Sequence, residues 1–179
     1  MQENKPILIV GLGNPGVEYM RTRHNVGFMA VEYMAGADTM WKNERFAQTC
    51  HKNIGGYRVI FAKPQTFMND SGRSVRAIVD FYKIPIENVF VIHDDMDLKL
   101  GDVRTKVGGT SAGHNGIKSI DANIGREYTR IRIGIGHPRD SDVPIDVVDW
   151  VLGRFTPEQR TIVMNAVDAM ATDMLRSLG

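Results

Sequence analysis

Near its N-terminus the chain has a short, mainly apolar run, Ile7–Leu12, which overlaps the glycine-rich sequence GLGNPG of residues 11–16. An apolar run of roughly four to eight residues that stops at a glycine is typical of a strand buried on both faces. Such a strand needs other strands beside it and helices above and below it. The N-terminal segment therefore predicts an inner strand of an α/β sheet.

Further segments with strand patterns and segments with helix patterns follow along the chain. Further strands are predicted at Phe46–Lys52, Tyr57–Ala62, Val89–Ile92, Asp102–Val107 and Thr129–Ile135, the first two joined as a hairpin by Gly55-Gly56. Helices are predicted over residues 25–35, from Asp70 or Ser71 to about Tyr82, over His114–Ile124, and after Thr156. The last is the clearest, because Thr156, Pro157 and Gln159 form a capping box with proline at the first helical position.

These elements predict an α/β protein with a mixed, mostly parallel twisted sheet and helices on both faces. The 179 residues contain no repeat or linker, so we expect a single domain over residues 1–179. Cys50 is the only cysteine, which excludes an internal disulfide and a cysteine-based zinc site.

The sequence GLGNPG also matches the dinucleotide-binding fingerprint, which would indicate a nicotinamide-dependent oxidoreductase. In that fingerprint the third glycine lies in a helix whose free N–H groups bind the pyrophosphate. Here Pro15 removes one donor and disfavours helical angles at Asn14, and no apolar stripe follows until about Val26. We therefore expect a loop at the end of a strand, with Asn14 at its rim.

Polar residues follow several of the predicted strands or lie in glycine-rich turns. They are Asn14 in GLGNPG, His24 in TRHNVG, Asn69 in TFMN, Asp94 in VIHDD and His114-Asn115 in GHNG. The loops at the carboxyl ends of strands in an α/β sheet converge and bind ligands. The joint placement of these residues predicts one site.

The segments TRHNVGF and GGTSAGHNGIKSI resemble the two signature segments of bacterial peptidyl-tRNA hydrolases. GLGNPG, KPQTFMNDSG, HDDMDL and RIRIGIGHP occur in the order found in that family, so the resemblance extends from about Ile7 to Phe155. It implies an enzyme that hydrolyses the ester between a peptide and the 3′-terminal ribose of tRNA. Many relatives continue with a short basic tail, whereas this chain ends at Gly179.

The resemblance implies that His24 is the catalytic base and that Asp94 supports it. Histidine suits this role, since its unperturbed pKa of about 6.5 allows it to take a proton from water near neutral pH. A carboxylate on the other ring nitrogen would fix the tautomer. No serine lies in a nucleophile elbow, so direct attack by water is favoured. Side-chain amides or backbone N–H groups would stabilise the oxyanion, and the sequence does not choose among them.

The resemblance assigns Asn14 to telling blocked from free amino groups on the substrate. Asn69 and Asn115 would hold the 3′ end and the peptide, and Tyr19 and Phe67 would offer flat surfaces for bases or sugar. Met68, between Phe67 and Asn69, is included in this substrate-binding set.

Lys106 and Arg132 match a basic pair with which the family clamps the tRNA 5′ phosphate. Residues 101–139 carry seven Lys or Arg against three Asp or Glu, a local balance of +4 within a chain of net charge +1. Arg130 shares the face of Arg132 by strand period, while Arg104, Lys118 and Arg126 are weaker candidates. Phosphate contacts give affinity without sequence preference, which suits an enzyme acting on every tRNA.

Two other functional classes remain open. His93, Asp94, Asp95 and Asp97 could suggest a metal site, but strand alternation sends neighbours to opposite faces. The basic segment alone would also fit a non-catalytic RNA-binding module, which has no need of His24. We expect no metal or cofactor, no membrane segment, no obligate protein partner, a monomer, and a cytoplasmic location.

Overall fold

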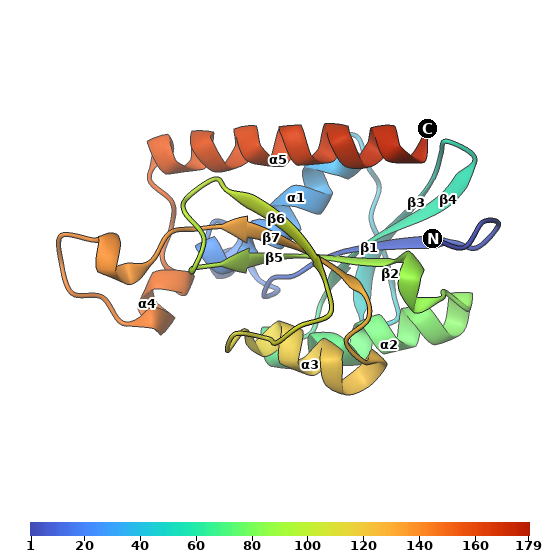
Figure 1. Cartoon of the computed structure of the whole chain (residues 1–179), viewed down its shortest axis with the longest axis horizontal. Helices are drawn as coiled ribbons and strands as arrows, with labels where there is room; N and C mark the ends of the chain where they lie inside the picture. The colour runs from blue at the N-terminus through green and yellow to red at the C-terminus, as the bar shows by residue number, and fades with distance from the viewer.

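The computed structural model describes residues 1–179 and places one seven-stranded sheet between two layers of helices (Figure 1). The strands are β1 (Ile7–Gly11), β2 (Lys42–Glu44), β3 (Ala47–Ile54), β4 (Tyr57–Pro64), β5 (Val89–Asp95), β6 (Val103–Val107) and β7 (Thr129–Gly134). The helices are α1 (Val26–Ala35), α2 (Ser71–Tyr82), α3 (Asn115–Ile124), α4 (Val147–Leu152) and α5 (Pro157–Leu178). Short 3-10 helices are η1 (Val17–Tyr19), η2 (Arg23–Asn25), η3 (Met68–Asp70), η4 (Ile86–Asn88) and η5 (Pro138–Asp140).

The sheet has the strand order β2-β3-β4-β1-β5-β7-β6. Its centre, β4-β1-β5-β7, is parallel, while β3 and β6 run antiparallel to their inner neighbours. The expected mixed, mostly parallel sheet is confirmed. The carboxyl ends of the parallel strands lie on one edge, at the left in Figure 1, where α4 also lies.

Side-chain alternation along the strands divides the core into two apolar clusters. On β1, Ile7 and Ile9 pack with residues of α1 and α5, whereas Leu8 and Val10 pack with residues of α2 and α3. The two pairs of helices accordingly cover opposite faces of the sheet (Figure 1). The expectation of helices on both faces is confirmed.

The observed element boundaries differ from the predicted ones at a few places. Phe46 lies in the β2–β3 turn rather than in a strand, with a positive φ of 61°. Asp70 occupies the N-cap position of α2 but makes no side-chain cap bond, because its carboxylate pairs with Arg73 at 3.2 Å. β2 and α4 were not predicted; β2 has only three polar residues and α4 spans only six.

The last helix is as predicted. The Thr156 hydroxyl accepts from the backbone N–H of Gln159, and the Gln159 side chain accepts from the backbone N–H of Thr156. The predicted apolar stripe of this helix, Val163, Ala166, Val167, Met170 and Met174, faces the sheet and α1. No helix of the structure is both long enough and apolar enough to cross a membrane.

The short helix α4 is fastened to the segment that precedes α1. The guanidinium of Arg23 lies 3.7 Å above the ring of Trp150 and donates to the Trp150 backbone oxygen at 3.1 Å. The indole N–H of Trp150 donates to the backbone oxygen of Gly136 at 2.9 Å. Arg23 is the residue immediately before His24, so its contacts with Trp150 fix the position of α4 relative to the predicted base.

Candidate active site

The predicted site residues come from loops at the carboxyl edge of the sheet. Asn14 follows β1, Asp94 lies near the end of β5, and His24 is carried by η2 just before α1. A cavity of about 280 Å³ at this edge is lined by His24, Asp94, His114 and Asn115. Val147, Val148 and Val151 of α4 supply its apolar wall. The topology thus brings segments far apart in the chain to one hollow.

His24 and Asp94 form a hydrogen-bonded pair. Nδ1 of His24 lies 2.9 Å from Oδ2 and 3.0 Å from Oδ1 of Asp94. A carboxylate only accepts, so Nδ1 carries the hydrogen and Nε2 of the neutral ring has a free lone pair. The side chain of Asp94 is 3% exposed and that of His24 is 14% exposed. The carboxylate is therefore buried, while the imidazole reaches the cavity.

His114 is a second partner of Asp94 that the sequence analysis did not assign. Its Nε2 lies 2.8 Å from Oδ1 of Asp94, and its ring lies 5.1 Å from that of His24. Its Nδ1 accepts the backbone N–H groups of Gly116 and Ile117, which makes it the N-cap of α3. These two bonds require the hydrogen on Nε2, so His114 donates to Asp94. The sequence places His114 among the polar residues expected at the site, but gives it no role.

The environment shifts the pKa values of both members of the pair. Burial lowers the pKa of His24, but the charge of Asp94 and its hydrogen bond outweigh burial and raise it above the ordinary value of 6.5. Burial raises the pKa of Asp94, but His24 and His114 prevail and hold it far below its ordinary value. Asp94 is therefore ionised at every pH near neutrality and stabilises a proton on His24.

The GLGNPG loop packs tightly against α1 and fixes Asn14. A side chain at Gly11 would approach the backbone oxygen of Gly27 to 2.0 Å, so glycine here permits close contact between β1 and α1. The Asn14 backbone and the Asn25 side chain exchange two hydrogen bonds of 2.9 Å. The Asn14 side-chain oxygen accepts the backbone N–H of Met68 at 2.8 Å. Its Nδ2 makes no bond within the chain and remains a free donor.

The dinucleotide interpretation lacks its structural context. The glycine-rich loop is followed by the three-residue η1, and the first α-helix begins only at Val26. Gly16 has a φ of 115° rather than a helical angle. No helix N-terminus is therefore available where a pyrophosphate would bind.

The other substrate-binding candidates differ in exposure. Phe67 is 61% exposed and meets the ring of Tyr19 edge-on, with centroids 6.5 Å apart. Asn69 and Asn115 are exposed, the former in η3 and the latter at the start of α3. Met68 is buried and is bound through its backbone to Asn14, so its side chain belongs to the core. Phe67 and Asn69 do not line the cavity that contains His24, whereas Asn115 does.

Lys106 and Arg132 line a second, smaller cavity of about 70 Å³. Lys106 is exposed and forms no ion pair, while Nε of Arg132 pairs with Asp95 at 2.9 Å. Arg130 shares the face of Arg132, as the strand period predicted, but is 2% exposed and pairs with Asp121 at 2.8 Å. Lys106 is therefore the uncommitted cation of this group. Below, we call this space the basic pocket.

The cluster His24, Asp94 and His114 has three possible metal-ligand atoms within 4.8 Å of one another. A nitrogen that binds a metal must carry no hydrogen, and Nε2 of His114 carries one because Nδ1 accepts two backbone amides. Metal binding at Nε2 would thus require breaking the cap of α3. On β5, Asp94 reaches His24 while Asp95 pairs with Arg132, so the HDDMD residues point apart. The donor set does not favour a metal.

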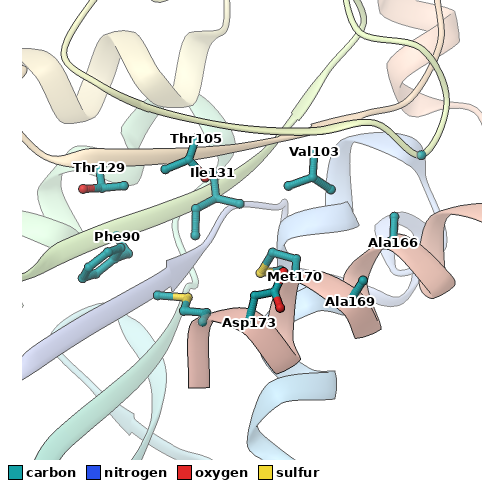
Figure 2. A pocket seen from close by; sticks show the side chains of 11 residues that line it. Phe90, Val103, Thr105, Thr129, Ile131, Ala166, Ala169, Met170 and Asp173 are labelled. Atoms are coloured by element: carbon teal, nitrogen blue, oxygen red, sulfur yellow. The ribbon is translucent and has the colours of Figure 1, made fainter. Parts of the chain in front are cut away.

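A further groove lies between α5 and strands β5, β6 and β7 (Figure 2). It measures about 520 Å³ and is lined chiefly by apolar side chains such as Phe90, Ile131 and Met170. Asp173 is its one charged lining residue, and none of the predicted site residues contributes to it. The groups able to perform acid–base chemistry are instead gathered at the carboxyl edge of the sheet.

Comparison with known proteins identifies a family. Residues 8–178 match the family model described as peptidyl-tRNA hydrolase. The chain is 48% identical over 165 residues to a peptidyl-tRNA hydrolase of Rickettsia bellii, covering 90% of this chain and 88% of that one. It is 46% identical over 174 residues to one of Aliarcobacter butzleri, covering 92% of each. The crystal structure of peptidyl-tRNA hydrolase from Acinetobacter baumannii superposes with a TM-score of 0.90 at 38% identity, covering 99% of this chain and 90% of that one.

Proposed function

This chain belongs to the peptidyl-tRNA hydrolase family and is an enzyme that hydrolyses peptidyl-tRNA, and we propose that His24 is the general base of that reaction. The observation that carries the proposal is the state of the two ring nitrogens. Nδ1 is held by the buried carboxylate of Asp94, and Nε2 is unbonded on a ring that lines the cavity. A histidine in this state can accept a proton from a water molecule beside the substrate.

In the first step, Nε2 of His24 removes a proton from a water molecule while the oxygen of that water attacks the ester carbonyl carbon. The resulting imidazolium has hydrogens on both nitrogens, and the negative charge of Asp94 stabilises it. The carbonyl oxygen becomes an oxyanion that requires a donor. We assign this donor to the side-chain amide of Asn115, because it lines the same cavity as His24 whereas Asn69 does not.

In the second step, the tetrahedral intermediate collapses and the bond to the ribose oxygen breaks. The leaving 3′ oxygen takes the proton from Nε2 of His24, which restores the neutral base. The products are a peptide with a free carboxylic acid, which then loses its proton to solvent, and a tRNA with a free 3′-terminal hydroxyl. No metal, cofactor or covalent intermediate takes part in this sequence. Released in this way, both products of peptidyl-tRNA that has left the ribosome would be reusable.

Asn14 would select substrates whose amino group is acylated. Its side-chain oxygen is occupied by the Met68 N–H, so it offers the two hydrogens of Nδ2. These hydrogens can bond the carbonyl of the first peptide bond. A free aminoacyl-tRNA has an ammonium group instead, which is itself only a donor and would face Nδ2 without a bond.

The tRNA itself would bind through its backbone and its exposed end. Lys106 and Arg132 would hold the 5′ phosphate in the basic pocket. Tyr19 and Phe67 would contact the terminal nucleotides, with Asn69 holding the 3′ end. We further propose that the enzyme is monomeric, has no obligate protein partner and acts in the cytoplasm, where its substrate is produced.

The decisive test is hydrolysis of N-acetylaminoacyl-tRNA by the wild-type protein and by His24→Ala, each with and without EDTA. General base catalysis contributes up to about 10⁴-fold, so the variant should lose roughly 10³-fold or more in kcat while still binding tRNA. His137→Ala, which removes a histidine outside the cavity, is the matched control and should keep wild-type turnover.

Each outcome of this test has a distinct meaning. Near-normal turnover by a folded His24→Ala variant would remove His24 from the role of base. Loss of wild-type activity in EDTA would require a metal.

A further inference from the structure

His93 forms part of the wall between the catalytic cavity and the basic pocket. It lines both spaces, together with Asp95, Ser111 and Ala112. On β5 it lies directly opposite Arg132 of β7. Because neighbouring residues of a strand point to opposite faces, His93 points toward the side of Arg132 while Asp94 reaches His24. No part of the proposed reaction uses this histidine.

One side of the His93 ring is bonded to the catalytic group. Its Nδ1 donates to the backbone oxygen of Asp94 at 2.8 Å. Its ring packs edge-on against that of His114, with centroids 5.0 Å apart. His114 in turn donates to the Asp94 carboxylate. A displacement of His93 would therefore move Asp94 in two ways. It would act on the backbone oxygen of Asp94 directly, and on the Asp94 carboxylate through His114.

The other side of the ring has an unpaired acceptor. The side chain is buried, and Nε2 has no hydrogen-bond partner within the chain. Burial and the neighbouring His114 lower the pKa of His93 to about 3, so the ring is neutral and Nε2 has a free lone pair. Buried polar atoms nearly always bond to protein or to ordered water.

The basic pocket also contains an unpaired donor. Arg130 bonds Thr110 and Asp121 through its terminal nitrogens, but its buried Nε has no partner. Arg130 and His93 both line this cavity of about 70 Å³. A space of this size has room for a few water molecules. A water there can accept from Nε of Arg130 and donate to Nε2 of His93, which satisfies both atoms at once.

We propose that His93 is a positioning residue that couples the basic pocket to the catalytic pair through a water molecule held between Arg130 and His93. The proposal rests on the proposed function, in which this pocket receives the 5′-terminal phosphate of tRNA. A phosphate drawn in by Lys106 and Arg132 orders the water, and the water fixes the His93 ring. The ring then holds Asp94, and through it His24, in the arrangement needed for proton transfer. Binding at a remote point of the substrate would thus increase turnover and not only affinity.

The first test needs no variant. It compares kcat and KM of the wild-type enzyme for N-acetylaminoacyl-tRNA with a 5′ phosphate and for the same substrate with a 5′ hydroxyl. Coupling predicts that removal of the phosphate lowers kcat about 5-fold or more, in addition to raising KM. A change in KM alone would leave the phosphate clamp standing and overturn the coupling. No change in either quantity would overturn the clamp itself, and the coupling with it.

The second test uses two conservative variants of His93. The side-chain nitrogen of His93→Asn can occupy the position of Nδ1 and keep the bond to Asp94, but nothing replaces Nε2. Its kcat should therefore differ less than 2-fold between the two substrates, while KM still responds to the phosphate. His93→Gln can replace Nε2 but not Nδ1, so its kcat should fall with both substrates. A wild-type ratio of kcat values in a folded His93→Asn variant would overturn the proposal.

A spectroscopic measurement on the wild-type protein tests the proposal even if the His93 variants do not fold. In wild-type protein with ¹⁵N-labelled histidine, NMR should show His93 as the neutral tautomer with hydrogen on Nδ1. Its Nε2 resonance should shift when tRNA with a 5′ phosphate is added, and should shift less with 5′-hydroxyl tRNA. Equal responses to the two tRNAs would contradict a link through the basic pocket.

Discussion

The buried catalytic group and the exposed rim of the site differ in how firmly the protein holds them. Asp94 is fixed by His24, His114 and the bond from His93, and Asn14 is fixed by Asn25 and Met68. The rim, which we define as Phe67, Asn69 and Lys106, is exposed to solvent. In the proposed mechanism the reacting groups are therefore in place before substrate arrives, whereas the proposed tRNA contacts form on binding.

Because of this difference, we expect substitutions of the buried groups and of the exposed side chains to change different kinetic constants. Groups already in place contribute most to the transition state, so their removal should lower kcat. Exposed side chains contribute mainly affinity, so their removal should raise KM. The predictions below test this division, beginning with the largest effect after that of His24.

Asp94→Asn should reduce kcat by roughly 10²- to 10³-fold. The amide cannot stabilise the imidazolium and can present a donor to His24, which favours the wrong tautomer. Steady-state kinetics with N-acetylaminoacyl-tRNA measure the effect. Asp80→Asn, which removes an exposed carboxylate paired with Arg76, is the matched control and should leave kcat unchanged. A change in KM alone would mean that Asp94 contributes to substrate binding and not to the chemical step.

The pH dependence of the same variants adds a directional check. His24 works as a base only when neutral, and its pKa is raised above 6.5 by Asp94 against the effect of burial. The wild-type kcat/KM should therefore rise with pH through a midpoint above 6.5 and then level off. In Asp94→Asn only burial remains, so the midpoint should move to lower pH. A shift to higher pH would contradict the assigned pair.

Asn14→Ala should lower kcat/KM for N-acetylaminoacyl-tRNA by about 10- to 100-fold, which corresponds to the loss of one buried hydrogen bond of roughly 1–3 kcal/mol. The activity on aminoacyl-tRNA with a free amino group should fall much less, because that substrate never formed the bond. The ratio of the two activities is the measurement. An unchanged ratio would mean that a residue other than Asn14 distinguishes acylated from free amino groups.

Lys106→Ala should give the smallest effect, a rise in KM of several-fold together with a fall in kcat smaller than that expected on removal of the 5′ phosphate, because Arg132 still contacts the phosphate. Loss of one phosphate contact should reduce the slope of log binding constant against log salt by about one. Lys5→Ala, an exposed lysine before β1, should change neither quantity. Wild-type salt dependence in Lys106→Ala would contradict the phosphate contact.

Much of the fold could be predicted because local signals and tertiary packing agree. The capping box at Thr156 and the apolar stripe after it defined α5, and the run from Ile7 defined β1. Where local signals are weak, prediction failed. β2 consists of three polar residues and forms because β3 offers it a hydrogen-bonding edge, and α4 is held mainly through the contacts of Trp150 with Arg23 and Gly136.

The site was partly predictable for the same reason. Strand ends and loop motifs indicated that His24 and Asp94 share one site, but they did not indicate the other hydrogen-bond partners of Asp94. The bond from His114 to Asp94 joins residues 20 positions apart and depends on the path of the loop before α3. Likewise, strand period placed Arg130 and Arg132 on one face, yet only packing against Asp121 determined that Arg130 is buried.

The stacking of Arg23 on Trp150 has a practical consequence. The residue beside the proposed base anchors the helix that walls the cavity, so the two walls cannot separate without parting guanidinium from indole. Trp150 is one of only two tryptophans in the chain. The enzyme thus has a natural fluorophore on the helix that lines the cavity, and movement of this helix away from Arg23 should change its emission.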